Sequence, residues 1–230
     1  MSRDDGMPAG RHHLRRWLIA AGVLLVLLTG SWLVAFSSVL GVRTVTVTGT
    51  RTLTAGQVEA AAAIRPGTPL SRLNTAAVRA RVAAIAAVRT VIVRTSYPST
   101  VTIQVTERVA VGYRAVPAGA ALVDADNVSF RTQPSAPAGL PKLELAGDQA
   151  RSAAAATVAG SLPAALARRV ALIAAPTTES ITLTLRDGRT VMWGGTDRSA
   201  DKAKLVNALV GQPGRYFDVS DPSSVISRGA

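Results

Sequence analysis

The sequence predicts an α+β protein in three parts: an apolar N-terminal helix, a compact strand–helix–helix–strand–strand unit, and a mixed β domain with helices. Three observations favour this fold class. Residues 17–36 contain no charged side chain, residues 44–48 and 100–106 alternate valine or isoleucine with polar residues, and short apolar runs separated by turn residues follow residue 108. A chain of 230 residues is long enough for two small domains beside one helix.

The first part is the run WLIAAGVLLVLLTGSWLVAF, residues 17–36. An α-helix rises about 1.5 Å per residue and the hydrocarbon core is about 30 Å thick, so about 20 apolar residues can cross it. We therefore predict a cytoplasmic tail over residues 1–16 and a transmembrane helix over residues 17–38. The residues that we assign to the membrane segment are Trp17, Leu24, Leu28, Trp32 and Phe36.

The charges before this run predict its orientation. Arg11, Arg15 and Arg16 flank its start, which favours a cytoplasmic N-terminus and an extracytoplasmic C-terminus. The rival interpretation is a signal peptide cleaved near Ala35-Phe36-Ser37. An apolar core of about 7–15 residues is typical of signal peptides, and this run is longer. The retained anchor is therefore the preferred interpretation, and it places the protein in the plasma membrane as a single-pass chain.

The second part, residues 39–108, reads as a strand, two helices and two further strands. Thr54 is a suitable cap for a helix over residues 55–64, and Asn74 or Thr75 for a helix over residues 73–88. Val78, Val82 and Ile85 recur at helical spacing and predict a buried face. The strands over residues 88–96 and 100–107 are joined by Tyr97-Pro98-Ser99, since proline favours a tight turn.

The strand from Thr100 to Thr106 has two different faces. Val101, Ile103 and Val105 predict a core face, whereas the hydroxyl-rich opposite face is either solvated or docked on a partner. Glu107-Arg108 is interpreted as a solvated strand end; the alternative is a role in fixing the angle between the two domains.

The third part, residues 109–230, is predicted as a mixed β domain. Its turns are at residues 124–127 and at Asp187-Gly188, the second within a hairpin over residues 180–194. The first turn lacks the glycine and glutamate of an EF-hand loop, so no calcium site is predicted. Residues 150–175 read as helical with a break at Gly160 and Pro163. A further helix begins at Thr196, Asp197 or Ser199 with Leu205, Val206 and Leu209 on its apolar face, and residues 215–227 read as extended.

Composition excludes several kinds of chemistry. Cysteine is absent and both histidines, His12 and His13, precede the apolar run, so no cysteine nucleophile, histidine triad or thiolate zinc site can form beyond it. The nearest carboxylate pairs, Asp124/Asp126 and Asp218/Asp221, lie in turn-like sequence rather than across a cleft. We predict no catalytic residue, cofactor, metal or small-molecule substrate.

The charge balance indicates anionic surroundings. Lys and Arg outnumber Asp and Glu by 26 to 14, which favours nucleic acid, lipid headgroups or acidic wall polymers as neighbours. The arginines are scattered, aromatic residues make up 4% of the chain, and the cytoplasmic tail is short. These features argue against nucleic acid, and most of the surplus is interpreted as solvated surface.

Five segments in order carry a resemblance to a known family. They are VRTVTVTGTRTLT, GTPLSRLNTAAVRARVAAIAAVRTVIVRTSYPSTVTIQVTERVAVGY, ALVDADNVSF, GGTDRSADKAKLVNALV and GRYFDVSDPSSVISR. Together they resemble the FtsQ/DivIB family of bacterial cell-division proteins. The resemblance implies a POTRA domain, a C-terminal β domain, no enzymatic activity, and a scaffolding role in the divisome at the septum. It also implies FtsB-type and FtsL-type bitopic division proteins as partners, beside other divisome proteins.

The resemblance further implies a partner-binding segment formed by the final strand and the helix before it. The residues it points to here are Tyr216, Phe217, Val219, Val225, Ile226, Leu205 and Leu209. This sequence departs from the expected pattern because SDPSSVIS has no aromatic residue and Pro222 removes one strand donor. For Val225 and Ile226, partner contact and core packing both remain open. The alternatives for the whole chain are a POTRA-bearing transport or assembly factor and a membrane-anchored cell-wall glycosidase.

Overall fold

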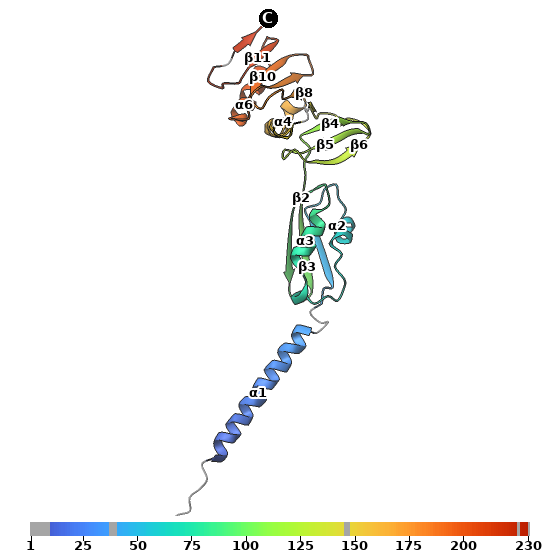
Figure 1. The fold of residues 1–230 in the computed structure, drawn as a ribbon, viewed down its shortest axis with the longest axis vertical. Coiled ribbons are helices and arrows are strands. Elements are labelled where there is room, and N and C mark those ends of the chain that lie inside the picture. Colours follow the sequence, from blue (N-terminus) through green and yellow to red (C-terminus); the bar gives the residue numbers. More distant parts are fainter. Residues whose placement is uncertain (1–9, 37–40, 145–147, 225, 230) are drawn as a thin grey trace, which may run out of the picture. The chain divides into compact units, whose positions relative to one another are not determined.

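The computed structural model describes residues 10–36, 41–144, 148–224 and 226–229, and for residues 10–15 and 31–36 it describes the backbone alone. The chain forms two compact units, described here one at a time (Figure 1). The first unit includes residues 90–106 and everything before residue 86. The second unit includes residues 86–89 and everything from residue 107.

Helix α1 extends from Gly10 to Phe36, so the predicted apolar helix forms. The side chains of Trp17, Leu24 and Leu28 are exposed, whereas those of Trp32 and Phe36 lie outside the described side chains. Within the described parts of the chain, no helix meets both the length and the apolarity required for crossing a membrane. The transmembrane assignment of residues 17–38 therefore stays a prediction.

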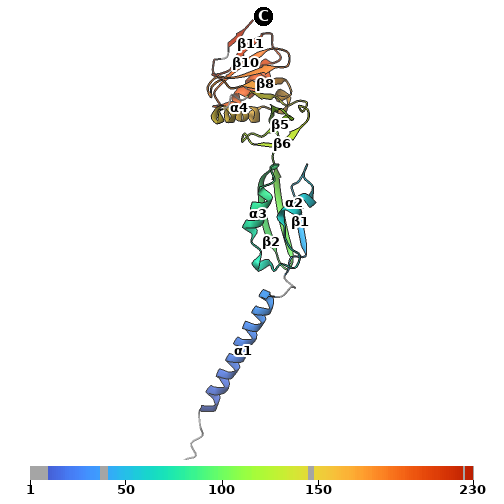
Figure 2. The same cartoon turned by 45° about the vertical axis from the view of Figure 1, so that its right-hand side comes forward.

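The strand–helix–helix–strand–strand unit is confirmed. Its three-stranded sheet has the order β1-β3-β2, and β1 pairs in parallel with β3, with Thr44 opposite Thr100. Figure 2 shows its helices beside the strands. The elements are β1 (Thr44–Thr48), α2 (Ala55–Ala62), the 3₁₀ turn η2 (Leu70–Arg72), α3 (Thr75–Ala83), β2 (Val88–Ser96) and β3 (Thr100–Glu107).

Local chemistry explains where the two helices begin. Thr54 Oγ1 accepts from Gln57 N at 3.2 Å and Thr54 N donates to Gln57 Oε1 at 2.9 Å, which is a complete capping box. Asn74 Oδ1 caps α3 by accepting from Ala77 N at 2.9 Å. Both cap predictions are confirmed for Thr54 and Asn74.

Helix α3 ends earlier than predicted. It stops at Ala83, not at residue 88, because Ile85 N donates to Val82 O in a tighter turn and Val88 is buried at the start of β2. Val78 and Val82 are buried as expected, while Ile85 beyond the helix is only half-buried.

The two faces of β3 differ as the alternation predicted. Val101, Ile103 and Val105 are fully buried. On the opposite face Gln104 and Thr106 are exposed. The apolar side chains therefore form the core of the first unit, where burial of each removes its surface from water and stabilises the fold.

The second unit is built on one nine-stranded sheet with the order β12-β11-β10-β9-β8-β7-β4-β5-β6. The pairs β4–β7, β7–β8 and β10–β11 are parallel, and the other pairs are antiparallel. Its strands are β4 (Gly112–Val116), β5 (Gly119–Val123), β6 (Ser129–Gln133), β7 (Lys142–Glu144), β8 (Val170–Ala174), β9 (Ile181–Leu185), β10 (Thr190–Gly194), β11 (Tyr216–Asp218) and β12 (Ile226–Arg228). Its helices are α4 (Gln149–Ser161), α5 (Ala164–Ala167) and α6 (Ser199–Leu209).

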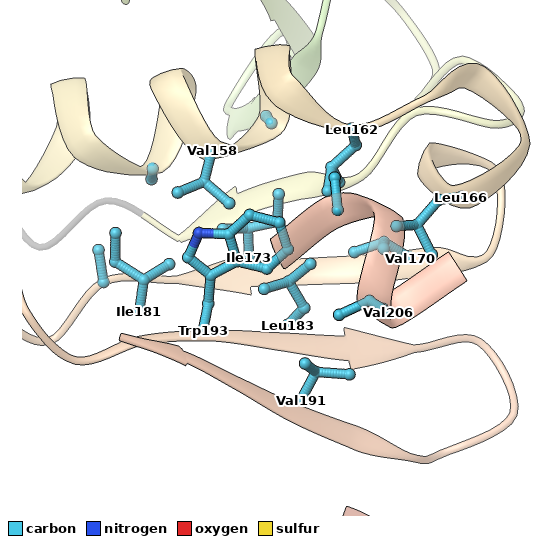
Figure 3. Close-up of a cluster of buried hydrophobic side chains, with 14 of the residues drawn as sticks. Val158, Leu162, Leu166, Val170, Ile173, Ile181, Leu183, Val191, Trp193 and Val206 are labelled. Atoms are coloured by element: carbon cyan, nitrogen blue, oxygen red, sulfur yellow. The ribbon is translucent and has the colours of Figure 1, made fainter. Parts of the chain in front are cut away.

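Trp193 on β10 lies at the centre of the core of this unit (Figure 3). It is fully buried among side chains from α4, from the neighbouring strands and from α6, including Val158, Ile173, Leu183 and Val206. Its indole Nε1 donates to Ser199 Oγ at 3.3 Å, so the buried polar atom of the ring has a partner.

The prediction of helix through residue 175 is wrong for its last part. Residues 170–174 form β8, a central strand between β7 and β9. Pro163 ends the helical run after α4, and α5 is only four residues long. Val170 and Ile173 are then fully buried in the sheet, which tertiary packing favours over helix.

The two predicted turns of the domain are confirmed. Gly188 has φ +87 between β9 and β10. The turn after β5 is held by Asp124, whose Oδ1 accepts from Asp126 N at 3.1 Å and Val128 N at 2.8 Å. Asn127 has φ +62 in the same turn, a conformation that asparagine tolerates.

Arg108 is not a solvated strand end. Its guanidinium forms an ion pair with Asp124, and the two side chains are 17% and 4% exposed. Arg89, in the part of β2 that belongs to the same unit, pairs with Asp126 at 3.1 Å. Within the second unit, these ion pairs join Arg89 and Arg108 to the turn after β5.

Helix α6 begins at Ser199, one of the three starts predicted from the sequence. Its N-cap is Arg198, in the left-handed conformation and with no side-chain cap. The Ser199 hydroxyl donates to Thr196 O at 2.8 Å and accepts from Trp193 Nε1.

Candidate interaction edge

The C-terminal edge of the nine-stranded sheet is the candidate functional site. The extended segment predicted for residues 215–227 is two short strands, β11 and β12, joined by a turn. β11 lies between β10 and β12, and β12 is last in the sheet order, so one side of β12 has no neighbouring strand among the described residues. An edge of this kind carries unpaired backbone N–H and C=O groups.

Backbone bonds fix the register of this edge. Val191 lies opposite Phe217 in the parallel pair, and Phe217 lies opposite Ser227 in the antiparallel pair. Val219 N donates to Met192 O at 2.9 Å, and Arg215 N donates to Gly229 O at 3.0 Å. The first bond extends the pairing of β11 with β10, and the second extends the pairing of β12 with β11 beyond Arg228.

Phe217 anchors β11 in the core. Its side chain is 1% exposed, and the Arg189 guanidinium lies 5.9 Å from its ring centroid. Gly214 has φ +140, and a Cβ there would lie 3.1 Å from this ring, so the approach to β11 requires glycine.

Arg189 ties the β9–β10 hairpin to the end of α6. Its Nη2 donates to Val210 O at 2.9 Å and to Asp187 Oδ2 at 2.7 Å. The hydrogen bond from Arg189 holds the pKa of the Asp187 carboxyl below its ordinary value, and the same pairing raises the pKa of Arg189.

The turn between β11 and β12 is organised by two aspartates. Asp218 Oδ1 accepts from Ser220 N at 3.0 Å and from Ser220 Oγ at 2.6 Å. Asp221 Oδ1 accepts from Ser223 N at 2.9 Å, and this backbone bond lowers the pKa of Asp221. The turn thus folds the chain back to form the edge strand.

Lys202 makes a buried structural contact that the sequence did not indicate. Lys202 lies on α6 with its side chain fully buried, and its Nζ donates to Gly195 O and to Asp197 Oδ1, each at 3.1 Å. This lysine therefore connects α6 to the residues that follow β10, the strand on which β11 is paired. No local pattern distinguishes Lys202 from an exposed helical lysine such as Lys204, so its role becomes visible only in the folded chain.

The predicted partner-binding residues occupy three kinds of position. Phe217 and Val219 are in the core. Tyr216, Leu205 and Leu209 are half-buried, and Leu209 packs against the core cluster. Ile226 is 43% exposed on the edge strand, and Val225 lies outside the described residues. Ile226 is thus the predicted contact residue that the described edge presents most openly.

The two carboxylate pairs named from the sequence have structural partners. Asp124 and Asp126 bind arginines, while Asp218 and Asp221 hold turn backbone. Across the residues with described positions, no group of three or more His, Cys, Asp or Glu side chains is arranged to hold a metal ion.

Two family models match the chain. The model described as "POTRA domain, FtsQ-type" matches residues 40–108. The model described as "Cell division protein FtsQ/DivIB, C-terminal" matches residues 113–221. The match to the second model ends within the turn that precedes β12.

Similar curated proteins come from several bacteria. The chain is 40% identical to the cell division protein FtsQ of Mycobacteroides abscessus over 225 residues, which is 95% of this chain and 72% of that protein. It is 43% identical to FtsQ of Mycolicibacterium smegmatis over 209 residues, covering 90% of this chain and 62% of that protein. It is 36% identical to FtsQ of Streptomyces venezuelae over 231 residues, which is 94% of this chain and 84% of that protein.

Proposed function

Because the chain belongs to the FtsQ/DivIB family of cell division proteins, we propose that it is a non-catalytic, single-pass membrane scaffold of the divisome. Its C-terminal edge receives an FtsB-type bitopic protein, which in turn brings an FtsL-type partner. The observation that carries this proposal is the place of β12 at the end of the sheet, with Ile226 exposed on it.

The proposed contact is strand addition. A strand of the partner pairs with β12 through backbone hydrogen bonds, and its alternate side chains meet the exposed side chains of the edge. β12 is only three residues long, so backbone pairing alone provides few bonds. Ile226 supplies apolar contact beside them, and we include the half-buried Tyr216, Leu205 and Leu209 in the proposed partner-binding segment.

The proposed anchor is the apolar part of α1. The absence of charge from residues 17–36 and the arginines before them support insertion with the N-terminus in the cytoplasm. Both folded units then lie outside the cytoplasm, at the membrane where division occurs.

A scaffolding role also agrees with the state of the acidic residues. The carboxylates of the two candidate pairs are engaged by arginines or by turn backbone, whereas a general acid or base must face its substrate. The proposal therefore assigns these groups to stability rather than to chemistry.

Binding of a purified FtsB-type protein to the full chain in detergent tests the edge. Ile226→Asp places a charge on the strand where an apolar contact forms, so we expect capture to weaken by about tenfold or more. The matched control is Val109→Asp, at a valine that is 66% exposed and outside every strand, and it leaves capture unchanged. Unchanged capture by Ile226→Asp, with the fold intact by circular dichroism, would refute strand addition at β12.

A further inference from the structure

The first unit is strongly basic. Apart from α1 and the residues before it, it carries seven arginines and no lysine, against the single carboxylate Glu59. No acidic residue occurs between Glu59 and Glu107. One carboxylate cannot balance seven guanidinium groups, so this unit carries a net positive charge beyond α1.

Backbone bonds gather three segments of this unit at one end. Arg43 N donates to Ser99 O at 2.9 Å, which joins the start of β1 to the turn between β2 and β3. Val42 N donates to Thr68 O, and Gly67 N donates to Val42 O, each at 2.9 Å, which adds the loop after α2. The start of β1, the β2–β3 turn and this loop thus form one end of the unit.

The side chains at this end are an aromatic residue and cations. Tyr97, in the β2–β3 turn, is 65% exposed, although it is a large aromatic residue. Arg43, Arg65 and Arg94 are also exposed. We call these four residues the Tyr97 end.

The Tyr97 end is also the part of the unit nearest to α1 along the chain. Seven residue steps separate Phe36, the last residue of α1, from Arg43. A fully extended chain covers at most about 3.5 Å per step, so Arg43 lies within about 25 Å of the end of α1 in every conformation. If α1 is anchored in a bilayer, the headgroups are the nearest extended anionic surface.

We propose that the Tyr97 end binds the headgroups of anionic phospholipids in the bilayer that holds α1. The inference rests on the anchor proposed above and adds a second membrane contact, made by the folded unit itself. Arginines are attracted to an anionic leaflet within about one Debye length, and tyrosine is enriched at the headgroup level because its ring is apolar and its hydroxyl is wet. The membrane is favoured over an acidic protein because the short tether confines this end to the vicinity of the bilayer.

The chain has no cysteine, so a single introduced cysteine can report on this contact. Ser96→Cys carries a polarity-sensitive fluorophore beside Tyr97, and the full chain is placed in nanodiscs of phosphatidylcholine alone or mixed with phosphatidylglycerol. We expect the emission to shift to shorter wavelength only in the nanodiscs with phosphatidylglycerol, and added salt reverses the shift. A label at Thr106→Cys, an exposed position at the other end of β3, shows no shift.

Charge variants identify the residues responsible. In the labelled Ser96→Cys chain, the double variant Arg43→Gln with Arg65→Gln abolishes the emission shift. The control double variant Arg51→Gln with Arg79→Gln removes the same amount of charge away from the Tyr97 end, and the emission shift remains. Tyr97→Ala reduces the shift. Equal emission from the Ser96 label in both kinds of nanodisc, or an equal loss with both pairs of arginine variants, would overturn the inference.

The anchor is tested separately in the same preparation. Flotation of the full chain with phosphatidylcholine vesicles at high salt measures insertion of α1. Failure to float refutes the proposed anchor, whereas flotation without the lipid-dependent shift at Ser96 refutes the contact of the Tyr97 end.

Discussion

The two folded units use their arginines differently. In the second unit many arginines are bound by aspartates of the same unit. In the first unit Glu59 is the single carboxylate among the residues beyond α1, and Arg81 instead donates from Nε to the backbone carbonyl of Ala62 at 3.0 Å. The aspartate-bound arginines of the second unit include Arg89, Arg108, Arg151 and Arg189, paired with Asp126, Asp124, Asp148 and Asp187.

This difference separates two roles of charge. Ion pairs of the second unit position turns and strands, and the surface that we propose for the partner is an open backbone edge. In the first unit the arginines outnumber the single carboxylate, and Arg43, Arg65 and Arg94 are exposed at the Tyr97 end. The net charge of the whole chain hides this division, because both units are basic in formal charge.

The largest expected effect concerns Arg108. Arg108→Ala leaves the buried carboxylate of Asp124 without its ion pair, so we expect the free energy of unfolding to fall by about 3 kcal/mol or more. Thermal unfolding of the full chain in detergent, followed by near-ultraviolet circular dichroism, measures it. Arg79→Ala, at an exposed arginine of the first unit, should cost less than about 0.5 kcal/mol. An equal decrease in the free energy of unfolding for both variants would contradict the conclusion that arginines stabilise the second unit more than the first.

Lys202 extends the comparison of charged residues between the two units, because it is a fully buried cation in the second unit. Lys202→Ala leaves a cavity and removes the donor to Gly195 O, and we expect a loss of about 3 kcal/mol in the free energy of unfolding. Lys202→Met retains the volume of the stem, and Asp197 is 65% exposed and returns to water, so the loss should be about 1 kcal/mol. The same unfolding assay distinguishes the two. A methionine variant as unstable as the alanine variant would show that the charge, rather than the buried stem, is what stabilises this region.

The smallest effect belongs to a surface pair. Arg189 lowers the pKa of Asp187 in the folded state, so the pair stabilises the protein at pH values above 3.8, the ordinary pKa of this carboxyl group. This stabilisation is lost as the pH falls through the lower pKa of the folded state. Asp187→Asn should cost about 0.5 kcal/mol at neutral pH and less in acid, since the Asp187 side chain is 51% exposed to solvent. Unfolding of both proteins between neutral and acidic pH measures the difference. A cost that does not decrease in acid would contradict it.

Most of the first unit could be predicted from sequence because its signals are local. The Val–Thr alternation of β1 and β3, the capping box at Thr54 and the turn at Tyr97-Pro98-Ser99 each depend on residues close in the chain. The sequence also contains Tyr97 and the long segment without carboxylates. That Tyr97 and Arg43 lie at the same end of the unit follows only from the parallel pairing of β1 with β3.

The second unit was harder to predict because distant contacts decide its structure. β8 follows an alanine-rich helix, and its sequence VALIA is equally apolar for a buried helix or strand. Phe217 and Val219 looked like candidate contact residues, yet β11 lies inside the sheet and buries them. Lys202 is buried through bonds to the residues after β10, which sequence spacing does not reveal.

The most direct test of the account is photo-crosslinking in dividing cells from the two opposite edges of the nine-stranded sheet. A crosslinker at Ser227 on β12 should capture an FtsB-type protein, and one at Thr132 on β6, the other edge strand, should not. Capture from Thr132 alone, or equal capture from both positions, would contradict the assignment of β12 as the edge that receives the partner.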